Sequence, residues 1–232
     1  MSDRKWRWDQ RREIAKMKAI AVNGSPRKDW NTGTLLKKAL EGAGSAGAET
    51  ELFNLYDLSF KGCSSCFSCK RKNGNFVGRC AMKDDLTGVL EKIMACDVLL
   101  LGSPIYLGNI TGEMKSFLER LIFMNLSYDS PSRINFKGRI SSGFIYTMGL
   151  PPERVALSGY QYIFDSAKNY LQLLNGSSEY VLSTDNYQFD DYSKYAASNF
   201  DEKHKAAVRA EQFPLDLQRA FEMGARLCSR VP

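Results

Sequence analysis

Histidine is almost absent from this chain of 232 residues, which contains only His204. That residue stands in a charged run, Asp201-Glu202-Lys203-His204-Lys205, which is typical of an exposed surface. A serine–histidine–aspartate triad and a histidine-rich metal site both depend on histidine in the core, so the sequence argues against them. We therefore expect a cofactor to carry the chemistry.

Long apolar runs are also missing. No stretch reaches the roughly 20 apolar residues that a membrane helix needs, and no apolar segment typical of a secretory signal follows the amino terminus. Hydrophobic residues make up 44% of the chain and charged residues 25%, which is typical of a globular protein with a substantial core. We expect a cytoplasmic protein without a membrane partner.

The net charge of +6 is modest and partly local. Residues 1–17 carry six Lys/Arg, three Asp/Glu and two tryptophans, a composition that could stack on nucleic acid. The run is short and mixed in sign, which favours a solvated arm or a subunit-docking segment. We expect no nucleic-acid partner, and a single domain over residues 18–232.

The segment Gly24–Thr32 is the strongest functional signal. It lies between an apolar, strand-like run (18–23) and a run with helical spacing (34–41). A small-residue loop at the start of a helix suits a phosphate, because backbone N–H groups are free there and the helix dipole favours negative charge. The candidate contacts are Ser25, Arg27, Asn31 and Thr32. The loop fits neither the P-loop nor the dinucleotide glycine pattern, and an ordinary polar turn is the alternative.

Strand-like and helix-like segments alternate along the chain. Strands are expected at 18–23, 51–55, 97–102, 140–148 and 179–182, and helices at 34–41, 84–95, around 114–122, at 161–174 and at 201–230, the last broken or restarted at Pro214. This order predicts an α/β fold, a doubly wound five-stranded parallel sheet with helices on both faces. Ligands bind such sheets at the carboxyl edge, where loops 24–32, 103–110 and 147–152 would converge.

With these loops, roughly residues 18–228 resemble the flavodoxin-like NAD(P)H-dependent FMN reductase family, including its iron–sulfur flavoprotein branch. The resemblance implies a flavodoxin-like fold, with the FMN phosphate on loop 24–32 and the flavin ring on loop 103–110. Residues 147–149 would lie near the pyrimidine end of the ring, and residues 186–192 look like a C-terminal segment of these reductases. The implied flavin contacts are Pro104, Ile105, Tyr106, Leu107, Gly108, Asn109, Thr147, Met148 and Gly149. From the residues alone, Tyr106 could also be a plain loop anchor.

The function implied by the resemblance is an FMN-dependent oxidoreductase. Reducing equivalents would pass from NAD(P)H through FMN to a quinone, a free flavin, a nitro or azo compound, or a metal ion. The cofactor supplies the chemistry, so no residue is assigned as general acid or base. The resemblance also implies a homo-dimer or homo-tetramer.

Four of the six cysteines fall in one segment, residues 62–83. Cys63, Cys66 and Cys69 have two residues in each gap, and Cys80 follows eleven positions after Cys69. Such a run could ligate a [4Fe–4S] cluster, as in the iron–sulfur flavoproteins, although their last gap is shorter. A zinc site is conceivable, disulfides are disfavoured in a reducing cytosol, and thiols with a structural or redox role are the favoured interpretation. The other two cysteines, Cys96 and Cys228, are expected to be buried.

Two other functions therefore stay open. The first is an electron carrier with FMN and a cluster on Cys63, Cys66, Cys69 and Cys80, fed by a ferredoxin-like partner. The second is a flavin-binding redox sensor that turns nothing over and uses the cysteine segment as a thiol switch.

Overall fold

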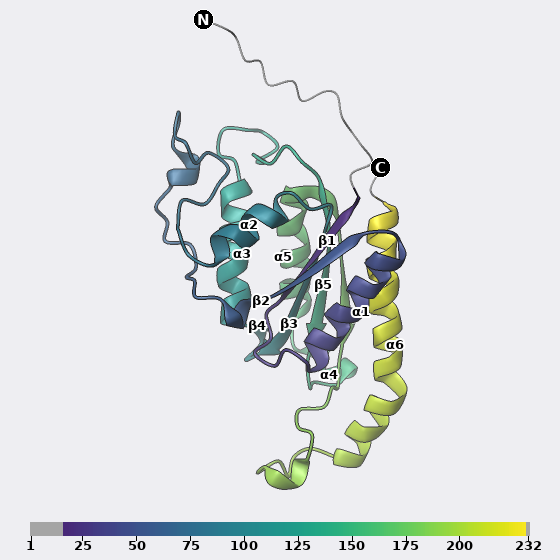
Figure 1. Cartoon of the computed structure of the whole chain (residues 1–232). Helices are drawn as coiled ribbons and strands as arrows, with labels where there is room; N and C mark the ends of the chain where they lie inside the picture. The colour runs from purple at the N-terminus through teal and green to yellow at the C-terminus, as the bar shows by residue number, and fades with distance from the viewer. Residues whose placement is uncertain (1–15, 231–232) are drawn as a thin grey trace, which may run out of the picture.

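The computed structural model describes residues 16–230 of the chain (Figure 1), so nearly all of the expected N-terminal arm, residues 1–17, lies outside the described residues. The strands are β1 (Lys18–Asn23), β2 (Glu49–Asn54), β3 (Val98–Tyr106), β4 (Asn109–Ile110), β5 (Ile140–Thr147) and β6 (Asn175–Ser183). The α-helices are α1 (Asn31–Ser45), α2 (Leu86–Ile93), α3 (Gly112–Asn125), α4 (Pro152–Leu157), α5 (Gln161–Leu171) and α6 (Glu202–Ser229), with four short 3₁₀ turns, η1 (Leu55–Asp57), η2 (Ser68–Lys70), η3 (Gln172–Leu174) and η4 (Tyr192–Lys194).

The sheet confirms the predicted fold class. Its strand order is β2-β1-β3-β5-β6, all parallel, with the short β4 added antiparallel to β3. The chain goes outward from β1 to β2 and then returns to the other side of β1 as β3, so the strand order reverses between β1 and β3. In Figure 1, α1 and α6 cover one face, and α2, α3 and α5 cover the other. Ligand sites in such sheets lie at this reversal point, outside the carboxyl ends of the strands.

Both faces of the sheet are buried, and alternate residues of each strand serve one face or the other. In β1, Ala19 and Ala21 pack with α1 and α6 in one hydrophobic core, whereas Ile20 and Val22 pack in the opposite core with α2 and α3. Small side chains on the first face bring the helices close to the sheet. The near-continuous apolar character of these strands is typical of a parallel sheet covered on both sides.

The helices α1 and α6 touch backbone to backbone through two glycines. A Cβ on Gly224 would lie 1.9 Å from the carbonyl oxygen of Ala39, and one on Gly42 would lie 2.0 Å from that of Phe221. The expected break at Pro214 is wrong, because α6 runs through this residue as one helix of 28 residues. Pro214 lies on the exposed side of α6, while buried side chains on both sides of it hold the helix on the sheet.

Two predicted element boundaries are also wrong. β3 does not end at Gly102 but continues to Tyr106, so residues 103–110 form strand, turn and strand instead of a loop; a residue before proline prefers extended backbone, which Ser103 adopts here. The second helix, expected from residue 84, begins at Leu86, so that Asp84 and Asp85 precede it. Among residues 16–230, no helix combines the length and the apolar character needed to cross a membrane.

Candidate functional site

An open cleft of about 500 Å³ lies at the carboxyl ends of β1, β3 and β5. It is lined by Ser25, Arg27, Trp30, Asn31, Thr32, Pro104, Ile105, Tyr106, Thr147, Met148, Gly149, Asn186, Tyr187 and Gln188. Three of the candidate residues, Leu107, Gly108 and Asn109, do not line it. They belong to the turn between β3 and β4, where Leu107 is fully exposed.

The wall made by loop 24–32 leads directly into α1. Trp30, which precedes the helix, makes no side-chain capping bond, and the first turn has no acidic residue. The hydroxyls of Thr32 and Thr147 hydrogen-bond across 2.7 Å and join α1 to the end of β5. A Cβ on Gly33 would lie 1.8 Å from the carbonyl oxygen of Lys28, so this tight loop needs glycine there. The open N-terminus of α1 therefore belongs to a compact wall with hydroxyl groups and the Arg27 guanidinium and without an acidic side chain in the lining, which suits an anion.

Three side chains of loop 24–32 hold the distant segment 186–188 over the cleft. Arg27 Nη1 donates to the carbonyl of Gln188 across 2.7 Å. Asn31 Nδ2 and Trp30 Nε1 both donate to the carbonyl of Tyr187, across 3.0 and 3.3 Å. The guanidinium of Arg27 also stacks on the ring of Trp30, 4.2 Å from its centroid. Residues 186–192 resemble a C-terminal segment of the reductase family, but no local pattern places them at the site, since these contacts join residues more than 150 positions apart.

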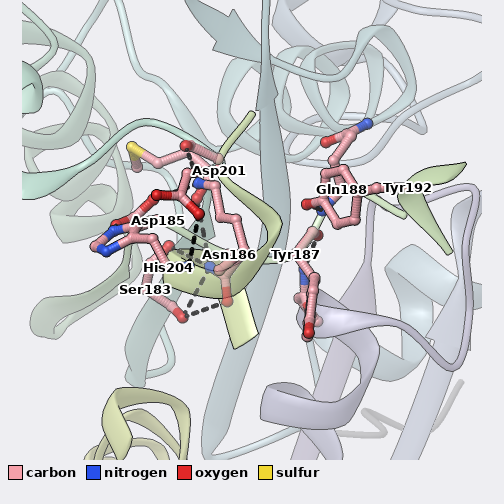
Figure 2. Close-up of polar contacts among 12 residues, drawn as sticks. Ser183, Asp185, Asn186, Tyr187, Gln188, Tyr192, Asp201 and His204 are labelled. Atoms are coloured by element: carbon pink, nitrogen blue, oxygen red, sulfur yellow. Dashed lines mark hydrogen bonds and ion pairs between the residues drawn. The ribbon is translucent and has the colours of Figure 1, made fainter. Parts of the chain in front are cut away.

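A polar cluster behind the cleft holds the loop that follows β5 (Figure 2). Asn186 donates its backbone N–H to the carbonyl of Met148 across 3.0 Å, and Met148 N–H donates to that of Ser183, also across 3.0 Å. The Asn186 side chain donates to the same Ser183 carbonyl across 2.7 Å. The segments 147–149 and 183–186 are therefore locked together by backbone and side-chain bonds.

Asp185 is the centre of the charged part of this cluster. Its carboxylate accepts hydrogen bonds from the buried Lys205 and, across 2.5 Å, from His204 Nε2. Lys205 Nζ also donates to the carbonyl of Gly149, which lines the cleft, across 2.8 Å. Burial would raise the pKa of Asp185, but the bonds from Lys205 and His204 outweigh it and hold the pKa below its ordinary value. His204 is more than half exposed, as expected, whereas the contacts of its neighbour Lys205 could not be foreseen from a charged run.

The four clustered cysteines surround a second, smaller pocket. Cys63, Cys66, Cys69 and Cys80 all line one narrow space, together with Ser64, Phe67, Ala81, Met82, Arg120, Phe123 and Met124. All six cysteines of the chain are free thiols, and Cys96 and Cys228 are buried as expected. Within residues 16–230, no three histidine, cysteine or acidic side chains stand close enough together to share one metal ion. The four thiols thus lie around a space and are not gathered at a single point.

Lys70 fastens this cysteine segment to α3. Its ammonium group donates to the carbonyls of Phe123 and, across 2.6 Å, of Leu126, at the C-terminal end of the helix. It also lies 4.6 Å from the ring centroid of Phe123. Protein contacts alone therefore hold the neighbouring Cys69 against α3.

Comparisons with known proteins bear on the family and the fold of this chain. Residues 17–149 match the family model described as NADPH-dependent FMN reductase. An iron–sulfur flavoprotein of Methanocaldococcus jannaschii is 33% identical over 133 residues, which cover 57% of this chain and 62% of the relative. An iron–sulfur flavoprotein of Archaeoglobus fulgidus is 39% identical over 104 residues, which cover 45% of this chain and 48% of the relative. The chain thus spans about half to three fifths of these curated relatives.

A solved structure shares the fold over nearly its whole length. The NAD(P)H:quinone oxidoreductase from Methanothermobacter marburgensis superposes with a TM-score of 0.64 at 16% identity, and the match covers 92% of this chain and 98% of that one.

Proposed function

Because this chain belongs to the NADPH-dependent FMN reductase family, we propose that it is an FMN-dependent oxidoreductase that takes reducing equivalents from NAD(P)H. The observation that carries the proposal is the cleft at the reversal point of the sheet. One wall is a phosphate-type loop at an open helix N-terminus, and the other is formed by the ends of β3 and β5. A planar cofactor with a phosphate tail fits such a slot.

The lining residues fall into two groups. Ser25, Arg27, Asn31 and Thr32 would hold the phosphate, through hydroxyl, amide and guanidinium donors. Pro104, Ile105 and Tyr106 would give the ring its apolar wall, and residues 147–149 would offer backbone groups to its polar end. The turn residues Leu107, Gly108 and Asn109 stay part of the proposal as the outer rim of this wall.

FMN, when bound, supplies the hydride-accepting chemistry. The chain positions the ring, and Lys205 fixes the Gly149 carbonyl beside it. No histidine and no carboxylate lines the cleft among the described residues, so no side chain is assigned as general acid or base. The proposed acceptors are a quinone, a free flavin, a nitro or azo compound, or a metal ion.

The test is steady-state oxidation of NADH and NADPH with each acceptor class, using protein loaded with FMN. We expect turnover that requires both the nucleotide and the acceptor, and that stops when FMN is stripped and returns when it is added back. Bound flavin without turnover on any acceptor would instead favour the redox-sensor function.

A second candidate function is favoured by one observation, that four cysteines line one pocket. There, Cys63, Cys66, Cys69 and Cys80 would hold a [4Fe–4S] cluster, and the protein would pass electrons to or from a ferredoxin-like partner. The pocket lies along α3, which begins beside the cleft directly after β4. Replacing Cys66 with serine should abolish iron binding and leave FMN bound; iron retained at the wild-type level would contradict the ligand assignment.

We also propose a cytoplasmic location and a homo-oligomer. Six free thiols in a chain of this size suit a reducing compartment. Exposed apolar side chains are of the kind that subunit contacts cover; here they include Tyr106, Leu107, Leu157 and Tyr162. Sedimentation equilibrium tests the oligomer, and a monomer at all concentrations would contradict it.

A further inference from the structure

Arg120 is a fully buried arginine with unused hydrogen-bond donors. Its side chain is 0% exposed. Nη1 donates to Asp84 Oδ2 across 2.5 Å and to the carbonyl of Lys61 across 3.3 Å. Nε and Nη2 have no hydrogen-bond partner in the described part of the chain, and neither does Asp84 Oδ1. Buried donors without an acceptor are rare and costly, so these two need an explanation.

The explanation lies in the neighbourhood of the guanidinium. Arg120 lines the same pocket as the four cysteines, and the other large side chains there are apolar: Phe67, Met82, Phe123 and Met124. An arginine side chain stays protonated in proteins, and Asp84 is the charged partner of this one. A permanently charged donor therefore adjoins a pocket whose acceptors are mainly sulfur atoms.

The charge of a group bound in the pocket would distinguish a purely structural role of Arg120 from a functional one. The Asp84 carboxylate balances the positive charge of the guanidinium, but it accepts a hydrogen bond only from Nη1. The donor nitrogens Nε and Nη2 are left without a partner. Four cysteine thiolates around an iron–sulfur core carry net negative charge, which increases further on reduction. Hydrogen bonds to the sulfur atoms are among the factors that set the reduction potential of such clusters. An anionic, sulfur-rich occupant would satisfy both free donors of Arg120.

The pocket is also held in place by the protein. Arg120 stands on α3, eight residues from the start of the helix and about 12 Å along its axis. Lys70 ties the cysteine segment to the far end of the same helix. Arg120 and the part of the cysteine segment next to Cys69 are therefore held on the same helix.

We propose that Arg120 donates hydrogen bonds to the sulfur atoms of an iron–sulfur cluster held by Cys63, Cys66, Cys69 and Cys80, and that it raises the cluster's reduction potential. This inference rests on the second candidate function above. Arg120 is a positioning residue, not a ligand. Its donors stabilise the more negative, reduced cluster more than the oxidised one, which is why the potential rises.

The experiment compares three variants with wild-type protein after anaerobic reconstitution with iron and sulfide. Arg120→Lys keeps the charge but loses the planar fork. Arg120→Met combined with Asp84→Asn removes the ion pair as a unit, so that no charge is left buried without a partner. Lys115→Met removes an exposed positive charge from the same helix and is the matched control. The readouts are iron and sulfide content, FMN content, and the midpoint potential from a redox titration followed by electron paramagnetic resonance.

We expect wild-type protein and Lys115→Met to hold the cluster at one midpoint potential. Arg120→Lys should hold it at a lower potential. The paired variant should keep FMN but lose iron several-fold, or retain it at a still lower potential. If the paired variant does not fold, the shift in Arg120→Lys decides.

An unchanged midpoint potential in the folded Arg120 variants overturns the proposal. Wild-type protein that binds FMN but no iron also overturns it, and leaves the FMN oxidoreductase function intact. Wild-type protein that holds the cluster but no FMN contradicts the oxidoreductase function and leaves the Arg120 proposal standing.

Discussion

The ammonium group of Lys205 donates a hydrogen bond to the carbonyl of Gly149 across 2.8 Å, and so joins α6 to the loop that lines the cleft. Lys205 is 5% exposed and is paired with Asp185, itself 6% exposed. A buried ammonium needs a partner of opposite charge, and here the pair also fixes a carbonyl at the proposed polar end of the flavin. This contact explains why a helix distant in sequence belongs to the site.

Replacing Lys205 with methionine should therefore weaken both the fold and flavin binding. The change leaves the Asp185 carboxylate with His204 Nε2 as its remaining side-chain hydrogen-bond partner and frees the Gly149 carbonyl. We expect a loss of about 2 kcal/mol of unfolding free energy. Chemical denaturation and FMN titration of the apoprotein measure the two effects. Lys203→Met, which removes an exposed charge from the same turn, is the control. Wild-type affinity and stability in Lys205→Met would refute the role of this contact.

Acid should remove the contribution of Asp185. Its folded-state pKa lies below the unfolded value of about 3.9. The stabilisation is therefore fully present above the unfolded pKa and is lost as the pH falls through the folded pKa. The thermal midpoint of wild-type protein should exceed that of Asp185→Asn by a constant margin near neutral pH, and this margin should shrink below about pH 4. A margin that does not change with pH would show that the ionised carboxylate contributes nothing.

Arg27→Ala should weaken FMN binding about tenfold, which corresponds to about 1.4 kcal/mol. The change removes a charge-assisted donor from the phosphate loop and also the bond that holds the Gln188 carbonyl over the cleft. Its neighbour Lys28 pairs with Asp57 across 2.5 Å and does not line the cleft, so Lys28→Ala is the matched control. Equal losses in both variants would indicate a general charge effect and not a phosphate contact.

Gly33→Ala should disrupt the phosphate loop, because the new Cβ would lie 1.8 Å from the carbonyl oxygen of Lys28. We expect protein with little bound flavin and a lowered thermal midpoint. Gly88 in α2 has open space around its Cβ position, so Gly88→Ala should keep its flavin and gain about 0.5–1 kcal/mol of stability. Full flavin occupancy in Gly33→Ala would contradict the loop assignment.

Pro214→Ala should stabilise the protein by about 1–3 kcal/mol, since proline inside a helix removes a backbone hydrogen bond and crowds the preceding turn. The residue is exposed within the unbroken α6, so its replacement by alanine removes no buried packing contact. Denaturant midpoints of the two proteins measure the difference. A loss of stability on substitution would contradict this expectation.

Local pattern was enough to predict most of the fold. The apolar runs at 18–23 and 140–148 mark β1 and β5 closely, because strands buried on both faces read as continuous apolar segments. The predicted break at Pro214 is wrong, because the tertiary packing of α6 outweighs the local cost of one proline. The end of β3 was missed because Ser-Pro resembles a loop signal, although the residue before proline is extended anyway.

The candidate site was predictable where it follows directly from a strand. Ser25, Thr32 and Thr147 line the cleft because β1 and β5 end there. Tyr187, Gln188 and Lys205 reach the site through hydrogen bonds to residues far away in sequence. No local period encodes such contacts, so the sequence offered no physical signal for them.

The central claim is tested most directly by the absorption spectrum of anaerobically purified protein before and after addition of NADPH. The account predicts a flavin spectrum that bleaches on addition of NADPH and recovers when an acceptor such as a quinone is added. Protein that binds no flavin, or bound flavin that neither NADPH nor NADH bleaches, would contradict it.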